Sequence, residues 1–297
     1  MARRPRLAAT AAVTWRDGVH LTGTPIWCDA RRRRDVCFAS SAERVGKTRT
    51  PAHGQLIGTR ETLALLDAGT GHLAVPLRKP FTLGTLRLEL IPSGRGLGAA
   101  ALFVQLGVRR VLYAGAIRTA GCDDPAEVRA CDAVVVAVPT DAARLPSIDE
   151  AAARVTKWAR TQLGGGKRPT VVVDSIVDAI EVATRLDVHV ACSRALCDAA
   201  ARAGASKLRT TGDIQLRLAS ERTRASDGPS ARVSLHGGDF VWPFAATRSQ
   251  LLAWIEQSGA REIYLTGERA EAIAAALGPR ARVLGPPQQM QLFREAR

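Results

Sequence analysis

The middle of the chain alternates short apolar strands with amphipathic helices. Runs rich in Val and Ala at 132–138, 170–174 and 188–191 predict buried strands, and residues 148–163, 176–186 and 194–203 predict helices. Ser175 or Asp174 can cap the second of these helices. Strands that alternate with helices favour parallel pairing, with the helices packed on the sheet. The alternation therefore predicts a small parallel α/β sheet.

The two ends of the chain have a different character. The first third consists of short apolar strands and tight turns, such as Asp17-Gly18, with one helical pattern at 59–67 and a strand of period two at 85–90. The last third predicts strands and helices at 232–235, 246–258, 262–266, 268–277 and 282–284. A chain of 297 residues can form one large domain or two ordinary ones.

Charge points to a polyanionic partner. The formal net charge is +14, and arginine, which binds phosphate through a planar fork, supplies most of the cations. Arg31, Arg32, Arg33 and Arg34 form a continuous run that could follow a nucleic-acid backbone. The alternatives are a solvated loop for the run and an arginine-rich genome for the whole composition.

Cysteine usage and hydropathy predict the compartment. Six cysteines occur without a Cys-x-x-Cys pair, which indicates reduced and mostly buried thiols. No signal peptide is evident, and no apolar run reaches the ~20 residues of a membrane helix. We expect a cytoplasmic protein that does not enter a membrane.

Two landmarks carry a resemblance to a known family. Residues 92–99 read Pro-Ser-Gly-Arg-Gly-Leu-Gly-Ala, and residues 113–119 read Tyr-Ala-Gly-Ala-Ile-Arg-Thr. With the flanking segments at 26–29 and 51–66 and the closing helix and strand at 250–267, these resemble metallo-β-lactamase-fold nucleases that carry an inserted β-CASP domain. Ligase-associated DNA exonucleases and mRNA 3′-end processing nucleases are the most similar groups. The resemblance runs from about Trp27 to Leu284.

The resemblance implies an α/β fold and a domain order. The expected core is an αββα metallo-β-lactamase sandwich, with its N-terminal part at 1–137 and its C-terminal return at 231–297. A β-CASP-like α/β domain is expected as an insertion at 138–230.

The departures from the family pattern fall on its metal ligands. Where the resemblance places ligands, this chain has residues that mostly cannot donate to zinc, namely Ser41, Glu43, Val45, Gly46, Arg95, Ala116, Gly237 and Gly267. The turn glycines Gly94, Gly98 and Gly115 remain. A hydrolytic two-metal site needs about five to seven donors. The chain is thus expected to keep the fold without the metal centre and to need no cofactor.

This pattern predicts a pseudoenzyme that binds nucleic acid or a nucleic-acid-processing protein, such as a ligase, a helicase or an active nuclease. Arg95 is expected to form an ion pair with Asp29 or Glu43, or else to hold a phosphate. The resemblance implies that the predicted phosphate contacts lie in or near loops at the family's active-site edge: Arg31, Arg32, Arg33, Arg34, Lys47, Arg49, Arg95 and Arg118. No base-reading motif is visible, so binding is expected through the backbone.

Two other functions remain open from the sequence. The first is an active exonuclease or phosphodiesterase with a rearranged zinc site built from Asp29, Glu43, His53, His236 or Asp239. These donors would have to converge within about 2.0–2.6 Å of one ion. The second is a non-catalytic scaffold whose basic surface is only compositional.

Overall fold

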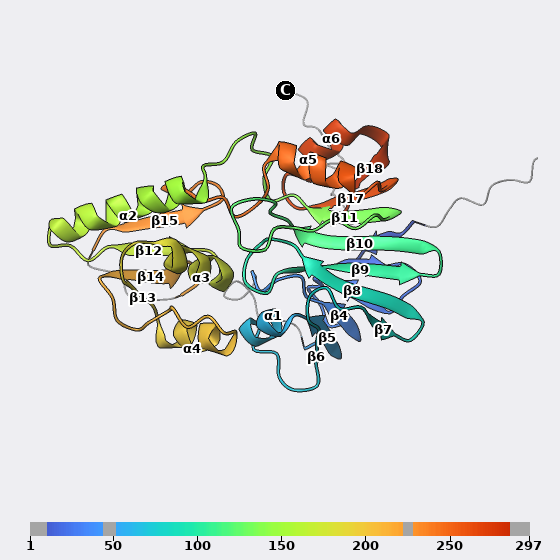
Figure 1. Ribbon diagram of the computed structural model, residues 1–297, viewed down its shortest axis with the longest axis horizontal. Coiled ribbons are helices and arrows are strands. Elements are labelled where there is room, and N and C mark those ends of the chain that lie inside the picture. Colours follow the sequence, from blue (N-terminus) through green and yellow to red (C-terminus); the bar gives the residue numbers. More distant parts are fainter. Residues whose placement is uncertain (1–10, 44–51, 222–227, 286–297) are drawn as a thin grey trace, which may run out of the picture.

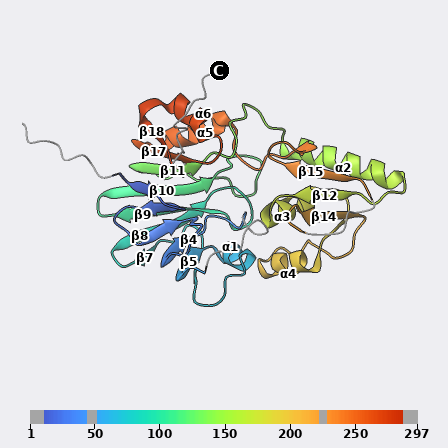
Figure 2. The same ribbon diagram turned by 180° about the vertical axis from the view of Figure 1, so that it is seen from behind.

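Three β-sheets organise the protein (Figure 1). The computed structural model describes residues 11–43, 52–221 and 228–285. The first and second sheets form one body, and the third sheet forms a second body beside it (Figures 1 and 2).

The first sheet has six strands in the order β1-β2-β3-β4-β5-β6. The first two pairings are antiparallel and the other three are parallel. The strands are β1 (Val13–Trp15), β2 (Val19–Leu21), β3 (Ile26–Cys28), β4 (Val36–Phe38), β5 (Gln55–Gly58) and β6 (Leu73–Ala74). Helix α1 (Arg60–Leu65) follows β5, and the Thr59 side chain caps it by accepting a hydrogen bond from the Thr62 amide.

The second sheet has seven strands in the order β18-β17-β11-β10-β9-β8-β7. Its first four strands pair in parallel and the remaining pairs are antiparallel. The strands are β7 (Phe81–Leu83), β8 (Leu86–Pro92), β9 (Ala100–Leu106), β10 (Arg109–Ala116), β11 (Ala133–Ala137), β17 (Glu262–Thr266) and β18 (Ala281–Val283). A short 3₁₀ turn, Gly278–Arg280, precedes β18.

These two sheets pack face to face and are covered by helices on their outer sides. Their shared core contains Phe38 and Ile57 from the first sheet, and Leu88, Leu102 and Tyr113 from the second. Helices α5 (Arg248–Gln257) and α6 (Ala270–Leu277) cover the far side of the second sheet. Helix α1 packs on the far side of the first. The body therefore has four layers, helix, sheet, sheet and helix.

The second body is inserted in the chain between β11 and α5. Its five strands are all parallel, in the order β13-β14-β12-β15-β16. They are β12 (Thr170–Val173), β13 (Val190–Ala191), β14 (Ile214–Leu218), β15 (Ser230–Ser234) and β16 (Phe240–Val241). Helices α2 (Ile148–Gly164), α3 (Ile176–Arg185) and α4 (Arg194–Arg202) share an apolar core with this sheet.

The structure confirms the predicted α/β class, with differences in detail. The sequence placed the end of the insertion at residue 230, but β15 and β16 extend the third sheet to Val241. Strand β14 was not expected, although Ile214, Leu216 and Leu218 alternate as buried residues along it. Its Gln and Arg residues interrupt the continuous apolar run that is typical of a central strand in a parallel sheet, so the local pattern does not predict it.

Among the described residues, no helix combines the length and the apolar character needed to cross a lipid bilayer.

Candidate functional site

Four chain segments meet at one edge of the four-layer body. Asp29 follows β3, Ser40 follows β4, Arg95 follows β8 and Arg118 follows β10. These strands run in the same direction within their sheets, so their C-terminal ends lie at the same edge. The Ser40 carbonyl accepts a hydrogen bond from the amide of Ala100, which joins the two sheets there. We call this region the strand-end edge.

Asp29 connects the first and second sheets through side-chain hydrogen bonds. One carboxylate oxygen accepts from the Ser40 amide at 2.9 Å, and the other accepts from the Ser40 hydroxyl at 2.6 Å and from the Tyr113 hydroxyl at 2.7 Å. Its backbone adopts a left-handed conformation with φ 47°. Asp29 is therefore held by hydroxyl and amide donors, and the expected pairing with Arg95 does not form.

Arg95 is a buried cation between two carboxylates. It forms ion pairs with Glu43 and, at 2.8 Å, with Asp178 of α3, and its guanidinium carbon lies 5.1 Å from the centre of the Phe244 ring. Only 7% of the residue is exposed. Burial alone would lower the pKa of Arg95, but the charges of Glu43 and Asp178 outweigh it and raise that pKa above its usual value. Arg95 thus stays charged, and it pairs with one of its two expected partners, Glu43.

Arg118, in the segment that follows β10, is likewise a buried cation paired with a carboxylate. It is 2% exposed and donates to both carboxylate oxygens of Glu181, at 2.8 and 2.9 Å. The Arg118 Nε donates to the Ala120 carbonyl at 3.1 Å, and the Trp242 indole nitrogen donates to Glu181 at 2.8 Å. Neither Arg95 nor Arg118 presents its guanidinium to solvent, so neither can contact a phosphate in this conformation.

Two of the three acids in these pairs come from the inserted body, and Glu43 comes from the four-layer body. Asp178 and Glu181 lie one turn apart on α3, so they share a face of that helix. The arginines come from the four-layer body. Two buried arginine–carboxylate pairs therefore connect the two bodies at the strand-end edge. We call Glu43, Arg95, Asp178, Arg118 and Glu181 the ion-pair cluster.

Two glycines allow the loops to approach closely. Gly94 has φ 73°, and a Cβ there would lie 1.9 Å from the Arg118 carbonyl oxygen. Gly115 has φ 61°, and a Cβ there would lie 2.7 Å from the Ser40 hydroxyl. Only glycine has both the conformation and the space for these contacts. The retained turn glycines thus serve the packing of the strand-end edge.

The side chains present do not fit a two-metal hydrolytic centre. A guanidinium has no lone pair to offer and carries a positive charge, so Arg95 occupies the edge with a group that opposes metal binding. Among the described residues, no three His, Cys, Asp or Glu side chains are grouped so that they could hold a metal ion.

The donors proposed for a rearranged site lie apart and are engaged elsewhere. His53 Nδ1 accepts from the Arg34 amide at 3.2 Å, and His236 Nε2 donates to the Pro139 carbonyl at 2.8 Å. Asp239 accepts from the Arg232 amide at 2.7 Å. These contacts do not bring the three residues to Asp29 and Glu43.

The thiols do not supply the missing donors. The six cysteines, all within the described residues, form no disulfide, and Cys28, Cys37, Cys131 and Cys192 are buried. Burial raises the pKa of Cys131 to about 11 and that of Cys192 to about 12. The thiolate is the form that binds metal, so these side chains remain protonated near neutral pH.

The other positions expected from the family pattern are spread around the edge. Ser41 accepts a hydrogen bond from the Glu43 amide at 3.0 Å, and Ala116 ends β10 as a half-buried residue. Gly267 follows β17, where a Cβ would lie 2.9 Å from the Val138 carbonyl oxygen, and Gly237 is in an exposed turn. Val45, Gly46, Lys47 and Arg49 lie outside the described residues.

The arginine run lies in the connection between β3 and β4. Arg31, Arg32 and Arg33 are exposed, and Arg32 pairs with Asp17 at 3.1 Å. The amide of Arg34 is bonded to His53, which lies just before β5, so the run ends near the starting ends of β4 and β5. Among the described residues, the run makes no ion pair with a member of the ion-pair cluster, and its convergence with Arg95 and Arg118 stays a prediction.

Asp178, Glu181, Tyr113 and Trp242 were not anticipated as members of this site. The sequence does carry one signal for two of them. Residues 176–183 read Ile-Val-Asp-Ala-Ile-Glu-Val-Ala, in which two acids three residues apart interrupt an otherwise apolar helix. Buried carboxylates need a cationic partner, so such a pair indicates an ion-pair interface.

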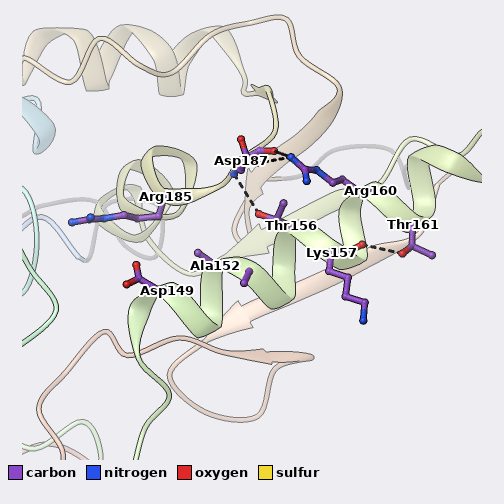
Figure 3. A pocket seen from close by; sticks show the side chains of 9 residues that line it. Asp149, Ala152, Thr156, Lys157, Arg160, Thr161, Arg185 and Asp187 are labelled. Atoms are coloured by element: carbon purple, nitrogen blue, oxygen red, sulfur yellow. Dashed lines mark hydrogen bonds and ion pairs between the residues drawn. The ribbon is translucent and has the colours of Figure 1, made fainter.

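A separate groove of about 690 Å³ lies between α2 and the segment after α3 (Figure 3). Figure 3 shows Arg160 directed at Asp187, and their ion pair measures 2.5 Å. Arg185 pairs with Asp123 at 2.7 Å. The cationic groups on this groove are thus partly neutralised, and no loop of the strand-end edge lines it.

His53 makes stability depend on pH. Burial, then the charges of Arg34 and His72, lower the pKa of His53 below its usual 6.5. His53 therefore binds a proton more readily in the unfolded chain than in the folded protein, and the stability of the fold decreases as the pH drops below about 6.5. We expect wild-type protein to lose more stability between pH 7.5 and 5 than a His53→Gln variant, measured by urea unfolding. An identical pH dependence in the two proteins would contradict this role.

Comparisons with known proteins identify a fold but no family. No protein-family model matches the chain, and no curated protein matches it. Among solved structures, it is similar to one described as a protein of unknown function from Enterococcus faecalis V583, with a TM-score of 0.54 and 11% identity. The match covers 84% of this chain and 79% of the other. At this identity the likeness establishes a shared fold over most of both chains.

Proposed function

We propose that this chain is a non-hydrolytic relative of the metallo-β-lactamase/β-CASP nucleases. In this proposal the four-layer body is an αββα metallo-β-lactamase sandwich, and the inserted body is a reduced β-CASP-like domain. Support comes from the order of layers, from an α/β unit inserted after β11, and from the loops of the family pattern meeting at the strand-end edge.

The ion pairs of Arg95 carry the proposal. The resemblance puts a metal-binding histidine at this position, and here a buried arginine lies between Glu43 and Asp178. A metal centre supplies positive charge that holds surrounding carboxylates. An arginine that pairs with carboxylates can replace that charge as a structural element, but it cannot activate a water molecule. The fold is thus kept and the hydrolytic step is lost.

A binding role follows from the charge of the chain. A net charge of +14 favours a polyanion, and nucleic acid is the polyanion that relatives of this kind handle. A nucleic-acid-processing protein such as a ligase, a helicase or an active nuclease is the corresponding protein partner. Contacts are expected through the phosphate backbone, with an affinity that falls steeply with salt.

Metal analysis and hydrolysis assays test the proposal together. Purified protein is examined by elemental analysis, and then incubated with labelled single-stranded and duplex DNA and RNA in Zn²⁺, Mn²⁺ or Mg²⁺. We expect no stoichiometric tightly bound metal, no hydrolysis that a chelator abolishes, and oligonucleotide binding that the chelator leaves unchanged.

Two outcomes would contradict it in different ways. Stoichiometric bound zinc together with chelator-sensitive hydrolysis would establish the alternative, an active nuclease with a rearranged site. Negligible binding to DNA and RNA at physiological salt, without a steep salt slope, would instead favour the non-catalytic scaffold.

A further inference from the structure

We propose that the outer face of the first sheet binds single-stranded nucleic acid. The surface consists of the stacked side chains of His20, Trp27 and Arg34 with four exposed arginines of the adjoining loops, Arg16, Arg31, Arg32 and Arg33, and we call it the basic face. The inference rests on the proposed nucleic-acid binding and assigns it to residues outside the ion-pair cluster.

Three planar side chains are stacked on this face. His20 and Trp27 are opposite each other in β2 and β3, and their ring centres lie 4.6 Å apart with an interplanar angle of 27°. The guanidinium carbon of Arg34 lies 3.8 Å from the centre of the Trp27 ring. Val19, Leu21, Ile26 and Cys28, their neighbours along the strands, point into the core. The stack therefore projects on the outer side, where both rings are half-exposed.

The stack is fixed in position before any ligand binds. His20 Nε2 donates to the Thr24 carbonyl at 2.9 Å. An Arg34 guanidinium nitrogen donates to the Arg16 carbonyl at 2.6 Å, which holds the side chain across the sheet. Side chains that are already ordered lose less entropy when a ligand binds.

Further cations belong to the two loops next to the stack, the β1–β2 turn and the β3–β4 connection. Arg16, Arg31 and Arg33 are exposed and take part in no ion pair with another described residue. Arg32 pairs with Asp17 and keeps 76% of its side chain exposed. Exposed arginines near a planar platform suit a chain of phosphates that carries bases. The charge and the shape of the face thus complement the same ligand.

A single strand fits this face better than a duplex. Bases of a duplex are stacked on one another, and their edges are read by an element that enters a groove. The basic face is instead the side of a sheet, with short loops and planar groups, which can accept only unstacked bases. Aromatic and arginine planes on a sheet are a common way to hold such bases.

The test compares two double variants in oligonucleotide binding. Arg31→Ala with Arg33→Ala removes two cations from the basic face, and Lys207→Ala with Arg261→Ala removes two exposed cations elsewhere. Binding of a labelled oligothymidylate and of a duplex of equal length is measured in chelator from 50 to 300 mM salt, with circular dichroism as a check of folding. Each phosphate contact to a single strand contributes about 0.7 to the slope of log K against log salt concentration.

We expect wild-type protein to bind the single strand at least about tenfold more tightly than the duplex, because bases of a single strand are free to stack. The Arg31/Arg33 variant should lower the salt slope by about 1.4, and the Lys207/Arg261 variant should leave it unchanged. Equal affinity for the duplex and the single strand, or an equal decrease of the salt slope in the two variants, would contradict the assignment of binding to the basic face. Nucleic-acid binding by the protein would still stand in that case. Absence of oligonucleotide binding by wild-type protein would contradict both the proposed nucleic-acid binding and its assignment to the basic face.

Discussion

Replacing Arg95 with methionine should lower the free energy of unfolding by about 3–5 kcal/mol, the cost of removing one partner from a buried ion pair. The variant keeps an unbranched side chain of similar length but leaves the carboxylate of Asp178, 5% exposed, without its cation. Glu43 is 34% exposed and can regain water, so most of the loss is expected from Asp178. Urea unfolding followed by circular dichroism measures the difference.

Arg78→Met is the matched control. Arg78 also contacts two carboxylates, Asp124 and Glu127, but 48% of its side chain is exposed. Exposed pairs contribute about 0–1 kcal/mol, so this variant should be nearly as stable as wild type. A second variant, Arg95→Met with Asp178→Leu, should recover much of the loss because no buried charge remains unpaired. If Arg95→Met costs no more than Arg78→Met, Arg95 is not the connection between the bodies that we infer.

Gly94→Ala should destabilise the protein by at least about 3 kcal/mol, through backbone strain and overpacking together. The added methyl would lie 1.9 Å from the Arg118 carbonyl oxygen, a backbone atom that cannot move aside without displacing the loop. That loop carries Arg118, so the damage should extend to its pair with Glu181. Thermal and urea unfolding of the variant give the effect.

Gly84→Ala is a control that separates backbone strain from the steric overlap of the added methyl group. Gly84 has φ 60°, close to the 73° of Gly94, but a Cβ there would meet nothing within 4 Å. The control therefore carries the conformational strain alone, which costs about 1 kcal/mol for a left-handed residue. Similar losses in both variants would mean that the close approach at Gly94 is relieved easily, and the packing of the strand-end edge would then need another explanation.

Local patterns were sufficient to find most elements of the fold. The Val-rich runs at 132–138 and 170–174 became β11 and β12, and Ser175 caps α3 as expected. The short apolar run at 188–191 became only a two-residue strand, β13. Strand β14 is not predicted by its local pattern, because polar residues alternate with the buried ones along it. This alternation is typical of strands with one solvent-exposed face and not of the centre of a parallel sheet.

The site was predictable only in part. The loss of metal donors at Val45, Gly46 and Arg95 is visible in the sequence, and so is the need of a buried arginine for an acid. The pairing with Glu43 was one of the expected outcomes. Asp178 was not, because it lies 83 residues from Arg95 in a helix of the inserted body.

The amino-acid sequence by itself determined most of the order of strands and helices and the types of side chain available at each loop, since periodicity and residue chemistry are local properties. Only the tertiary structure decided which charges meet. It placed Asp178 and Glu181 against Arg95 and Arg118, and it placed the Arg34 guanidinium over the Trp27 ring. An ion pair between distant residues depends on how α3 packs against the four-layer body. That packing results from apolar burial over many residues, and no single motif encodes it.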